Sequence, residues 1–243
     1  MDLLYVIGTG SKHNNAELKY SLRSIEKYCT GYDRVFVVGY KPDFLNDNVI
    51  FVPCEDKYNE YKHKNILNCI QTAVDTTDIS EDFVLQSDDH YYCKPYDFNK
   101  IPIYYKGLLL DSVSPKSTCP RYHTSLVVTR KILEHYGLPV LNGASHCGTR
   151  FNKTLFKSVE DTIIQDAYNN PWGIEPSAMM AALINKYQGL PYIYRKDCKA
   201  RDCSNEQILN EKIGDSFCFS CYEKAFNEEL MEKLYPNPSK YER

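Results

Sequence analysis

The 243-residue sequence has no long hydrophobic run and no strong excess of charge of either sign. No apolar stretch approaches the ~18 residues that a membrane-spanning helix requires, so we expect no membrane span. Residues 1–8 lack the basic leader of a signal peptide, and no small-residue cleavage site follows them. We therefore expect a cytoplasmic chain without an anchor of its own.

The composition also excludes other classes of protein. The net charge is −3 and the isoelectric point is about 6.1, whereas a protein that grips many phosphates of a nucleic acid is usually basic. With 43% hydrophobic residues the chain is too apolar to be disordered. We find no internal repeat, low-complexity segment or long linker. The length then favours a single domain over residues 1–243 with a helical tail.

The first ~90 residues alternate between two kinds of apolar pattern. Continuous apolar runs predict strands, and apolar residues at helical spacing predict helices. The predicted strands are residues 3–7, 34–39, 49–52 and 83–86, and the helices centre on residues 18–29 and 66–74. This order predicts an α/β fold with a mostly parallel sheet flanked by helices. Ligands of such sheets bind outside the carboxyl ends of the strands.

The second half is less regular. We predict a strand at residues 108–113 and helices at 125–136, 158–168 and 175–187. Three pairs resemble capping boxes, in which a polar residue is followed three positions later by Glu or Gln. These pairs are Asn14 with Glu17, Ser204 with Gln207, and Ser220 with Glu223. The last pair predicts a helix that runs to Leu234.

Asp88, Asp89 and His90 directly follow the apolar run at residues 83–86. This cluster places hard oxygen and nitrogen ligands at the mouth of the predicted sheet. A divalent metal held by one or two carboxylates, with the rest of its shell from water and substrate phosphates, fits such a site. The alternative is a polar turn in which the Asp side chains cap the end of the strand.

Residues 83–90 resemble the hydrophobic strand and Asp-x-Asp motif of glycosyltransferases with the GT-A fold. The resemblance implies a GT-A-like, Rossmann-like sheet and Mn²⁺ or Mg²⁺ bound to the diphosphate of a nucleotide sugar, most simply a UDP-sugar. Asp88, Asp89 and His90 would be metal ligands, with His90 at the place of the second Asp of the motif. A later histidine often joins them in this family, and we assign His146 to that role.

Two further segments resemble other transferases. Residues 17–28 are similar to a helix of Stealth-type sugar-phosphate transferases, which makes hexose-1-phosphate transfer an alternative. The acidic opening stretch of that family is absent from residues 7–12. Residues 121–124, 147–152 and 234–242 are similar to small glycosyltransferase-like proteins of phages and bacteria. The acceptor hydroxyl could then belong to a surface glycan or to a hydroxymethylated base in phage DNA.

The donor is expected to bind within residues 1–100 and the acceptor within residues 101–243. Glycine in the turn after the first strand permits close backbone approach to a nucleotide, and a helix amino terminus with a lysine suits a diphosphate. The predicted donor-binding residues are Thr9, Gly10, Ser11, Arg23, Lys64 and Asn65. Lys62 also lies where the second helix begins and is a candidate for the same role. Arg23 could instead cover the core with its aliphatic stem, and the lysines could belong to a solvated helix face.

An inverting transferase needs a base that takes the proton of the acceptor hydroxyl. We assign this role to Asp161, with Asp166 and Glu175 as rivals, because an acidic pair follows the metal motif in many inverting members. The alternative is a structural role for Asp161, because Ser158 and Asp161 have the spacing of a helix cap. His123 is the second predicted catalytic residue, at the acceptor.

Cys198, Cys203, Cys218 and Cys221 form two close pairs among ten cysteines. Four thiolates suit a tetrahedral structural Zn²⁺, and the alternative is buried free thiols. A zinc site would also fit a non-enzymatic hypothesis. In that case the chain is a zinc-stabilised module that binds a carbohydrate or a nucleotide without turnover.

Overall fold

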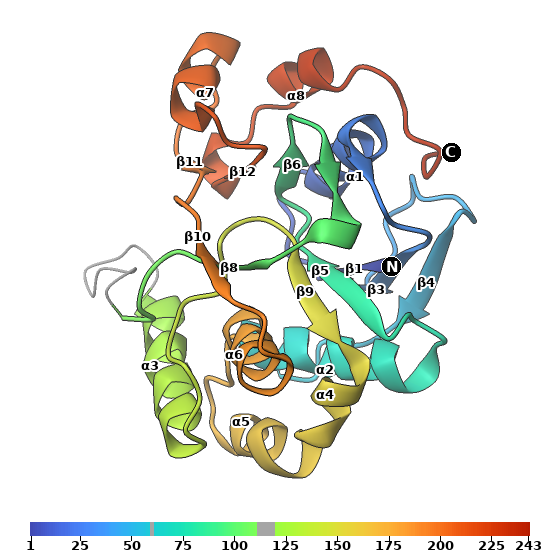
Figure 1. Ribbon diagram of the computed structural model, residues 1–243. Helices are drawn as coiled ribbons and strands as arrows, with labels where there is room; N and C mark the ends of the chain where they lie inside the picture. Colours follow the sequence, from blue (N-terminus) through green and yellow to red (C-terminus); the bar gives the residue numbers. More distant parts are fainter. Residues whose placement is uncertain (59–60, 111–119) are drawn as a thin grey trace.

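The computed structural model describes residues 1–58, 61–110 and 120–243 (Figure 1). Its centre is a five-stranded sheet with the order β4-β3-β1-β5-β9. The strands are β1 (Asp2–Ile7), β3 (Val35–Gly39), β4 (Val49–Pro53), β5 (Asp82–Gln86) and β9 (Thr149–Asn152). The first four run parallel, and β9 runs antiparallel to β5 at the edge. The predicted α/β fold with a mostly parallel sheet is therefore confirmed.

Helices cover both faces of this sheet, which explains why its strands are continuous apolar runs. Leu4 and Phe36 point to the face covered by α2 (Lys62–Thr76) and α6 (Pro176–Gln188). Leu3, Tyr5 and Val37 point to the other face, which α1 (Ala16–Tyr28) covers. Figure 1 shows α1 on one side of the sheet and α2 and α6 on the other.

A second, three-stranded sheet has the order β11-β12-β6. It consists of β6 (His90–Tyr92), β11 (Lys199–Ala200) and β12 (Cys218–Cys221). The two-stranded pairs are β2 (Cys29–Thr30) with β7 (Tyr96–Asp97), and β8 (Ile103–Tyr105) with β10 (Tyr192–Tyr194). The other α-helices are α3 (Pro120–His135), α4 (Lys153–Ser158), α5 (Gln165–Asn169), α7 (Glu206–Ile213) and α8 (Glu228–Leu234). Residues 160–164 form a π-helical turn.

The predicted helices of the second half are present, but two caps differ. Asn205 caps α7 by accepting a hydrogen bond from the Ile208 amide, so the cap lies one residue after Ser204. Ser220 starts no helix, because it lies within β12, and Asn227 caps α8 instead. Asparagine serves as well as serine at this position.

Two other local predictions also differ. Asn15, in the left-handed conformation, is the residue before α1, and it makes no side-chain cap; Glu17 accepts a hydrogen bond from the Ser11 hydroxyl. Of the predicted strand at residues 108–113, Leu108 forms an isolated bridge with Leu141, and residues 111–113 lie outside the described residues. Across the described ranges, none of the helices has the length and apolar character to cross a membrane.

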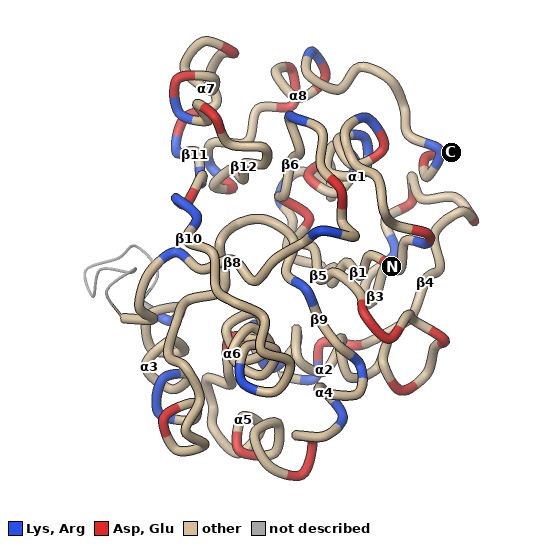
Figure 2. Tube along the Cα trace, viewed as in Figure 1, with Lys and Arg blue, Asp and Glu red and all other residues tan. Residues whose placement is uncertain are grey.

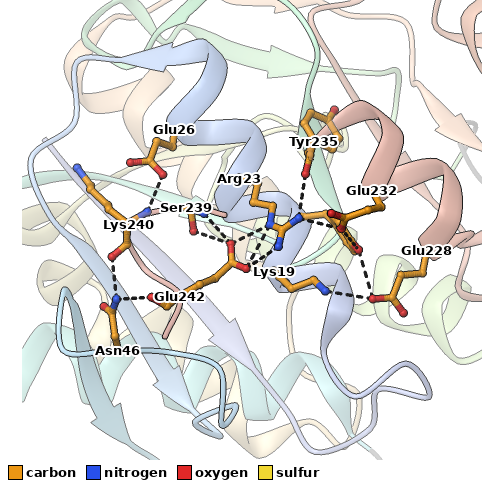
Figure 3. A network of polar contacts seen from close by, with 11 residues as sticks. Lys19, Arg23, Glu26, Asn46, Glu228, Glu232, Tyr235, Ser239, Lys240 and Glu242 are labelled. Atoms are coloured by element: carbon orange, nitrogen blue, oxygen red, sulfur yellow. Dashed lines mark hydrogen bonds and ion pairs between the residues drawn. The ribbon is translucent and has the colours of Figure 1, made fainter. Parts of the chain in front are cut away.

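An ion-pair network centred on the buried Arg23 side chain fastens the C-terminal segment to α1 (Figure 3). The Arg23 guanidinium donates to the Glu242 carboxylate at 2.8 Å and to the Glu232 carboxylate at 2.9 Å. Another of its N–H groups donates to the Tyr235 carbonyl at 3.0 Å. The Arg23 and Glu242 side chains are both 8% exposed. The network therefore holds the end of the chain against the helix that covers the central sheet.

Candidate functional site

The sheet has one point at which its strand order reverses. Counted along the chain, its four parallel strands lie in the order 3-2-1-4, so the reversal falls between β1 and β5. Doubly wound sheets bind their ligands at this switch point, outside the carboxyl ends of the strands. Residues 8–15 after β1 and residues 87–89 after β5 border it. The two strand ends that the sequence marked as polar are thus neighbours in space.

Asp88 and Asp89 lie in the tight turn between β5 and β6, which the His90 amide closes by donating to the Ser87 carbonyl at 3.2 Å. Burial, together with the neighbouring Asp89 carboxylate, raises the pKa of Asp88 to about 6. Burial opposes ionisation of Asp89 as well, but the positive charges around it, of which Lys199 is the strongest, together lower the pKa of Asp89 to about 2. The turn therefore concentrates negative charge that Lys199 balances at Asp89.

The small sheet aligns three polar side chains beside this turn. Ser220 of β12 pairs with His90 of β6 on one side and with Lys199 of β11 on the other, so the three side chains share a face. The Lys199 ammonium lies 3.3 Å from the Asp89 carboxylate. The Ser220 hydroxyl is fully buried and has no hydrogen-bond partner in the described part of the chain. Burial lowers the pKa of His90 to about 3, which keeps its imidazole neutral.

His146 reaches the same region from the loop before β9. Its backbone has a φ of 49°, a left-handed conformation that is uncommon for a residue with a side chain. Its Nδ1 contacts the Asp197 carboxylate, which also accepts from the Lys106 ammonium at 3.2 Å. Burial lowers the pKa of His146 and so favours its neutral ring, and only a protonated His146 would lower the pKa of Asp89. Burial alone would raise the pKa of Asp197, but the bond to His146 holds it well below its usual range.

This arrangement suits a metal ligand. Histidines that bind metals almost always hold a carboxylate or carbonyl on their other ring nitrogen, and that contact fixes the orientation of the ring. With Nδ1 on Asp197, His146 keeps Nε2 for a ligand. Asp197 and Lys106 were not predicted to belong to the site.

The loop after β1 carries three of the predicted donor-binding residues, and they have two different roles. The Ser11 hydroxyl accepts from the amides of His13 and Asn15 at 3.1 and 3.0 Å and donates to Glu17 at 2.9 Å. Ser11 therefore orders the loop. Thr9 and Gly10 are exposed, and a Cβ on Gly10 would meet no atom within 4 Å. These two residues leave the backbone open to a ligand at the carboxyl end of β1.

Of the two lysines at the start of α2, the structure puts Lys62 near the Asp pair. Lys64 is buried, and its ammonium donates to the Tyr168 carbonyl at 2.7 Å, away from the Asp pair. Asn65 accepts from the Tyr58 amide at 3.0 Å. Lys62 is exposed, and its positive charge opposes the rise in the pKa of Asp88 that burial and Asp89 cause. A lysine near the phosphates at this helix start would therefore be Lys62.

The predicted base does not lie near the Asp pair. Asp161 is exposed in the π-helical turn after α4. This segment follows β9, whose last residue, Asn152, pairs with Asp82 at the amino end of β5, so α4 starts at the opposite edge of the sheet. The rival residues have structural roles. Asp166 accepts from the Tyr136 hydroxyl at 2.8 Å, and Glu175 caps α6 through the Ala178 amide at 2.7 Å.

Two other predicted residues have surroundings of their own. Arg23 forms ion pairs with Glu232 and Glu242, so its role is to hold the C-terminal segment and not to bind phosphate. His123 lies near the start of α3, where the neighbouring Tyr122 ring packs 5.7 Å from the ring of His63. Among the described residues, His123 is not one of the groups that shift the pKa of Asp88 or of Asp89.

No model of a known protein family matches the sequence, and no curated protein matches it. Among solved structures, the chain is similar to a glycosyltransferase involved in the glycosylation of the major capsid of PBCV-1. The similarity covers 98% of this chain and 100% of that one, with 14% sequence identity and a TM-score of 0.45. At this sequence identity and TM-score, we assign no substrate and no residue role to this chain from the similar structure.

The structure does not bring the four cysteines of the predicted zinc site together. Cys218 and Cys221 stand three residues apart on an extended strand, so their side chains point to opposite faces. Cys218 packs in the core beneath α1, and Cys221 packs with Cys203 on the other side. Within residues 1–58, 61–110 and 120–243, no three His, Cys, Asp or Glu side chains form a ready-made metal site. Asp88, Asp89, His90 and His146 are among the side chains to which this statement applies.

Proposed function

We propose that the protein is a metal-dependent glycosyltransferase that moves a sugar from a nucleotide diphosphate sugar, most simply a UDP-sugar, to an acceptor hydroxyl. The observation that carries the proposal is the position of Asp88 and Asp89. Two carboxylates occupy the switch point of a parallel sheet, beside an exposed glycine turn, a lysine and a neutral histidine. The resemblance of residues 83–90 to the metal motif of GT-A enzymes points the same way.

The carboxylate and imidazole side chains at this site are suitable ligands for Mn²⁺ or Mg²⁺. Mg²⁺ usually takes one or two carboxylates from the protein and completes its shell with water and substrate phosphates, so a ready-made cage is not required. The raised pKa of Asp88 reflects burial and repulsion by Asp89, and a divalent cation would relieve that repulsion. Asp88 and Asp89 would hold the ion, with water and substrate phosphates completing its shell and with His90 and His146 nearby. The ion supplies charge neutralisation for the departing nucleotide diphosphate.

Other residues of the chain would bind and orient the substrates. Thr9 and Gly10 leave room for the nucleotide, and the exposed Lys62 offers a positive charge to the diphosphate. Asp197 holds the His146 ring in one orientation. Figure 2 shows Lys and Arg interspersed with Asp and Glu along the trace of the described residues. This distribution favours a glycan hydroxyl over a DNA base as the acceptor, because DNA binding depends on clustered positive charge.

The proposal is tested by incubating the purified protein with a panel of nucleotide sugars and measuring the reaction of each. We expect release of the nucleoside diphosphate from at least one nucleotide sugar with Mn²⁺ or Mg²⁺, and none with a chelator. Product mass distinguishes transfer of a sugar from transfer of a sugar phosphate, which would add one phosphate to the acceptor. The proposal fails if no donor of a complete panel is bound or hydrolysed.

Replacing Lys199 with Met is expected to tighten the binding of Mn²⁺ to the free protein by roughly tenfold, or ~1.4 kcal/mol. The Lys199 ammonium lies 3.3 Å from the Asp89 carboxylate and competes with any other cation there. The expected gain is small because both side chains are 23% exposed and solvent screens the pair. Isothermal titration calorimetry with MnCl₂ measures the change.

Lys196 provides the matched control for this measurement. It lies three residues away on the same segment and is exposed, so Lys196→Met should leave the affinity for Mn²⁺ within twofold. An unchanged or weakened affinity in Lys199→Met would mean that Asp89 does not take part in binding the metal.

A further inference from the structure

Cys203 and Cys221 are a pair of buried thiols whose sulfur atoms lie 2.8 Å apart. Cys203 lies in the segment between β11 and α7, and Cys221 is the last residue of β12. Their residues are 1% and 4% exposed. Cys221 points to the face of the small sheet opposite to Ser220, so the pair does not share the face that carries His90 and Lys199.

The surroundings of this pair do not suit a metal. Zn²⁺ in a structural site takes four ligands. In the part of the chain that the structure describes, no third Cys, His, Asp or Glu completes a group with these two sulfurs. Cys198 packs in the same apolar cluster, and Cys218 points to the opposite face. What remains is the chemistry of two adjacent thiols, which is the formation of a disulfide.

We propose that Cys203 and Cys221 form a reversible dithiol–disulfide pair that exchanges with small-molecule disulfides such as oxidised glutathione. The Cys203 thiolate attacks one sulfur of the small disulfide, which forms a mixed disulfide and releases one small thiol. The Cys221 thiolate then attacks the Cys203 sulfur and releases the second small thiol. The protein loses two hydrogens and two electrons, and the small disulfide takes them up as two thiols.

The local structure explains why Cys203 reacts first. Its neighbours Asp202 and Ser204 are both exposed, so a small local opening brings the Cys203 sulfur to solvent. The hydrogen bond from the Cys221 thiol stabilises the Cys203 thiolate and lowers the pKa of Cys203. Cys221 stays behind on the paired strand, in the position of the resolving thiol. The disulfide would close the segment that carries α7 onto β12.

Peptide mapping of the full-length protein tests the proposal. The reduced protein is incubated with oxidised glutathione, quenched in acid, alkylated and digested with trypsin under non-reducing conditions. We expect a loss of two of the ten titratable thiols. We also expect one cross-link between residues 202–212 and residues 213–224, located on Cys221 by fragmentation, and its complete reversal by a dithiol reductant.

Three single variants test the assignment of the cross-link independently, so the result does not depend on one variant that folds poorly. Cys203→Ser and Cys221→Ser should each abolish the cross-link, whereas Cys198→Ser, which removes another buried thiol of the same cluster, should retain it. The proposal is overturned if the oxidised protein keeps all ten thiols, or if the cross-link joins Cys198 or Cys218 instead. Neither result bears on glycosyl transfer, which the donor panel tests separately.

Discussion

Asp88→Asn and Asp89→Asn are each expected to lower the rate of sugar transfer by about 10³-fold, or ~4 kcal/mol of transition-state stabilisation. Asparagine keeps the shape of each side chain and removes the negative charge that would hold a divalent cation. Because the turn between β5 and β6 is closed by main-chain bonding, both variants should fold. Release of the nucleoside diphosphate at saturating donor and Mn²⁺, with circular dichroism as a check of folding, measures the effect.

Asp161→Asn is the informative comparison for these variants. A residue that acts as the general base contributes roughly 10²- to 10⁴-fold to the rate. Asp161 is exposed beyond the opposite edge of the sheet, so its replacement should change the rate by less than twofold. If Asp161→Asn were inactive while Asp88→Asn kept its activity, the proposed site would be in the wrong place.

The fold was predictable where local pattern and tertiary structure agree. The runs at residues 35–38 and 83–85 are buried on both faces of the sheet, and a strand covered on both faces must be apolar throughout. The caps were less predictable, because Ser204 and Asn205 are both good capping residues and only the course of the backbone selects between them. Ser220 has the spacing of a cap, but pairing with β6 and β11 makes it part of a strand.

The site was predictable only in its first half. Asp88, Asp89 and the turn after β1 follow strands that the pattern located, and the parallel order brings them together. Lys199 enters through the register of β11 with β12, more than a hundred residues later, and no local pattern encodes that register. The cysteine pattern around Cys198 predicts a zinc site, and nothing in that pattern marks Lys199 as part of the site of the Asp pair.

The lysines at the start of α2 show a similar limit. Lys62 and Lys64 are equivalent in the sequence, both within the first turn of a helix. Lys64 points to the interior and donates to the Tyr168 carbonyl, whereas Lys62 is exposed near the Asp pair. The distinction depends on which side of the helix packs against residues 168–173, and that contact comes from the second half of the chain.

Glu242→Gln is expected to lower the free energy of unfolding by about 3 kcal/mol at pH 7, because it leaves the buried Arg23 guanidinium without its closest charged partner. Burial opposes ionisation of Glu242, but the hydrogen bonds from Arg23 hold the pKa of Glu242 below its usual value. A carboxylate of this kind stabilises the fold above its unfolded pKa of ~4.3, and the contribution is lost as the pH falls through the lower native value. Urea unfolding from pH 7 down to pH 3 measures both effects.

Glu229→Gln is the matched control, because Glu229 is exposed on α8 beside the network and its replacement should cost less than about 0.5 kcal/mol. In Glu242→Gln the difference from the unmodified protein should shrink below pH 4, since Glu242 itself becomes protonated there. A deficit that stays constant down to pH 3 would mean that shape and packing, and not the charge of Glu242, fasten the C-terminal segment to α1. Acid release of this segment would then need another carboxylate, and Glu232, whose pKa is also lowered through its hydrogen bond from Tyr20, is the next to replace.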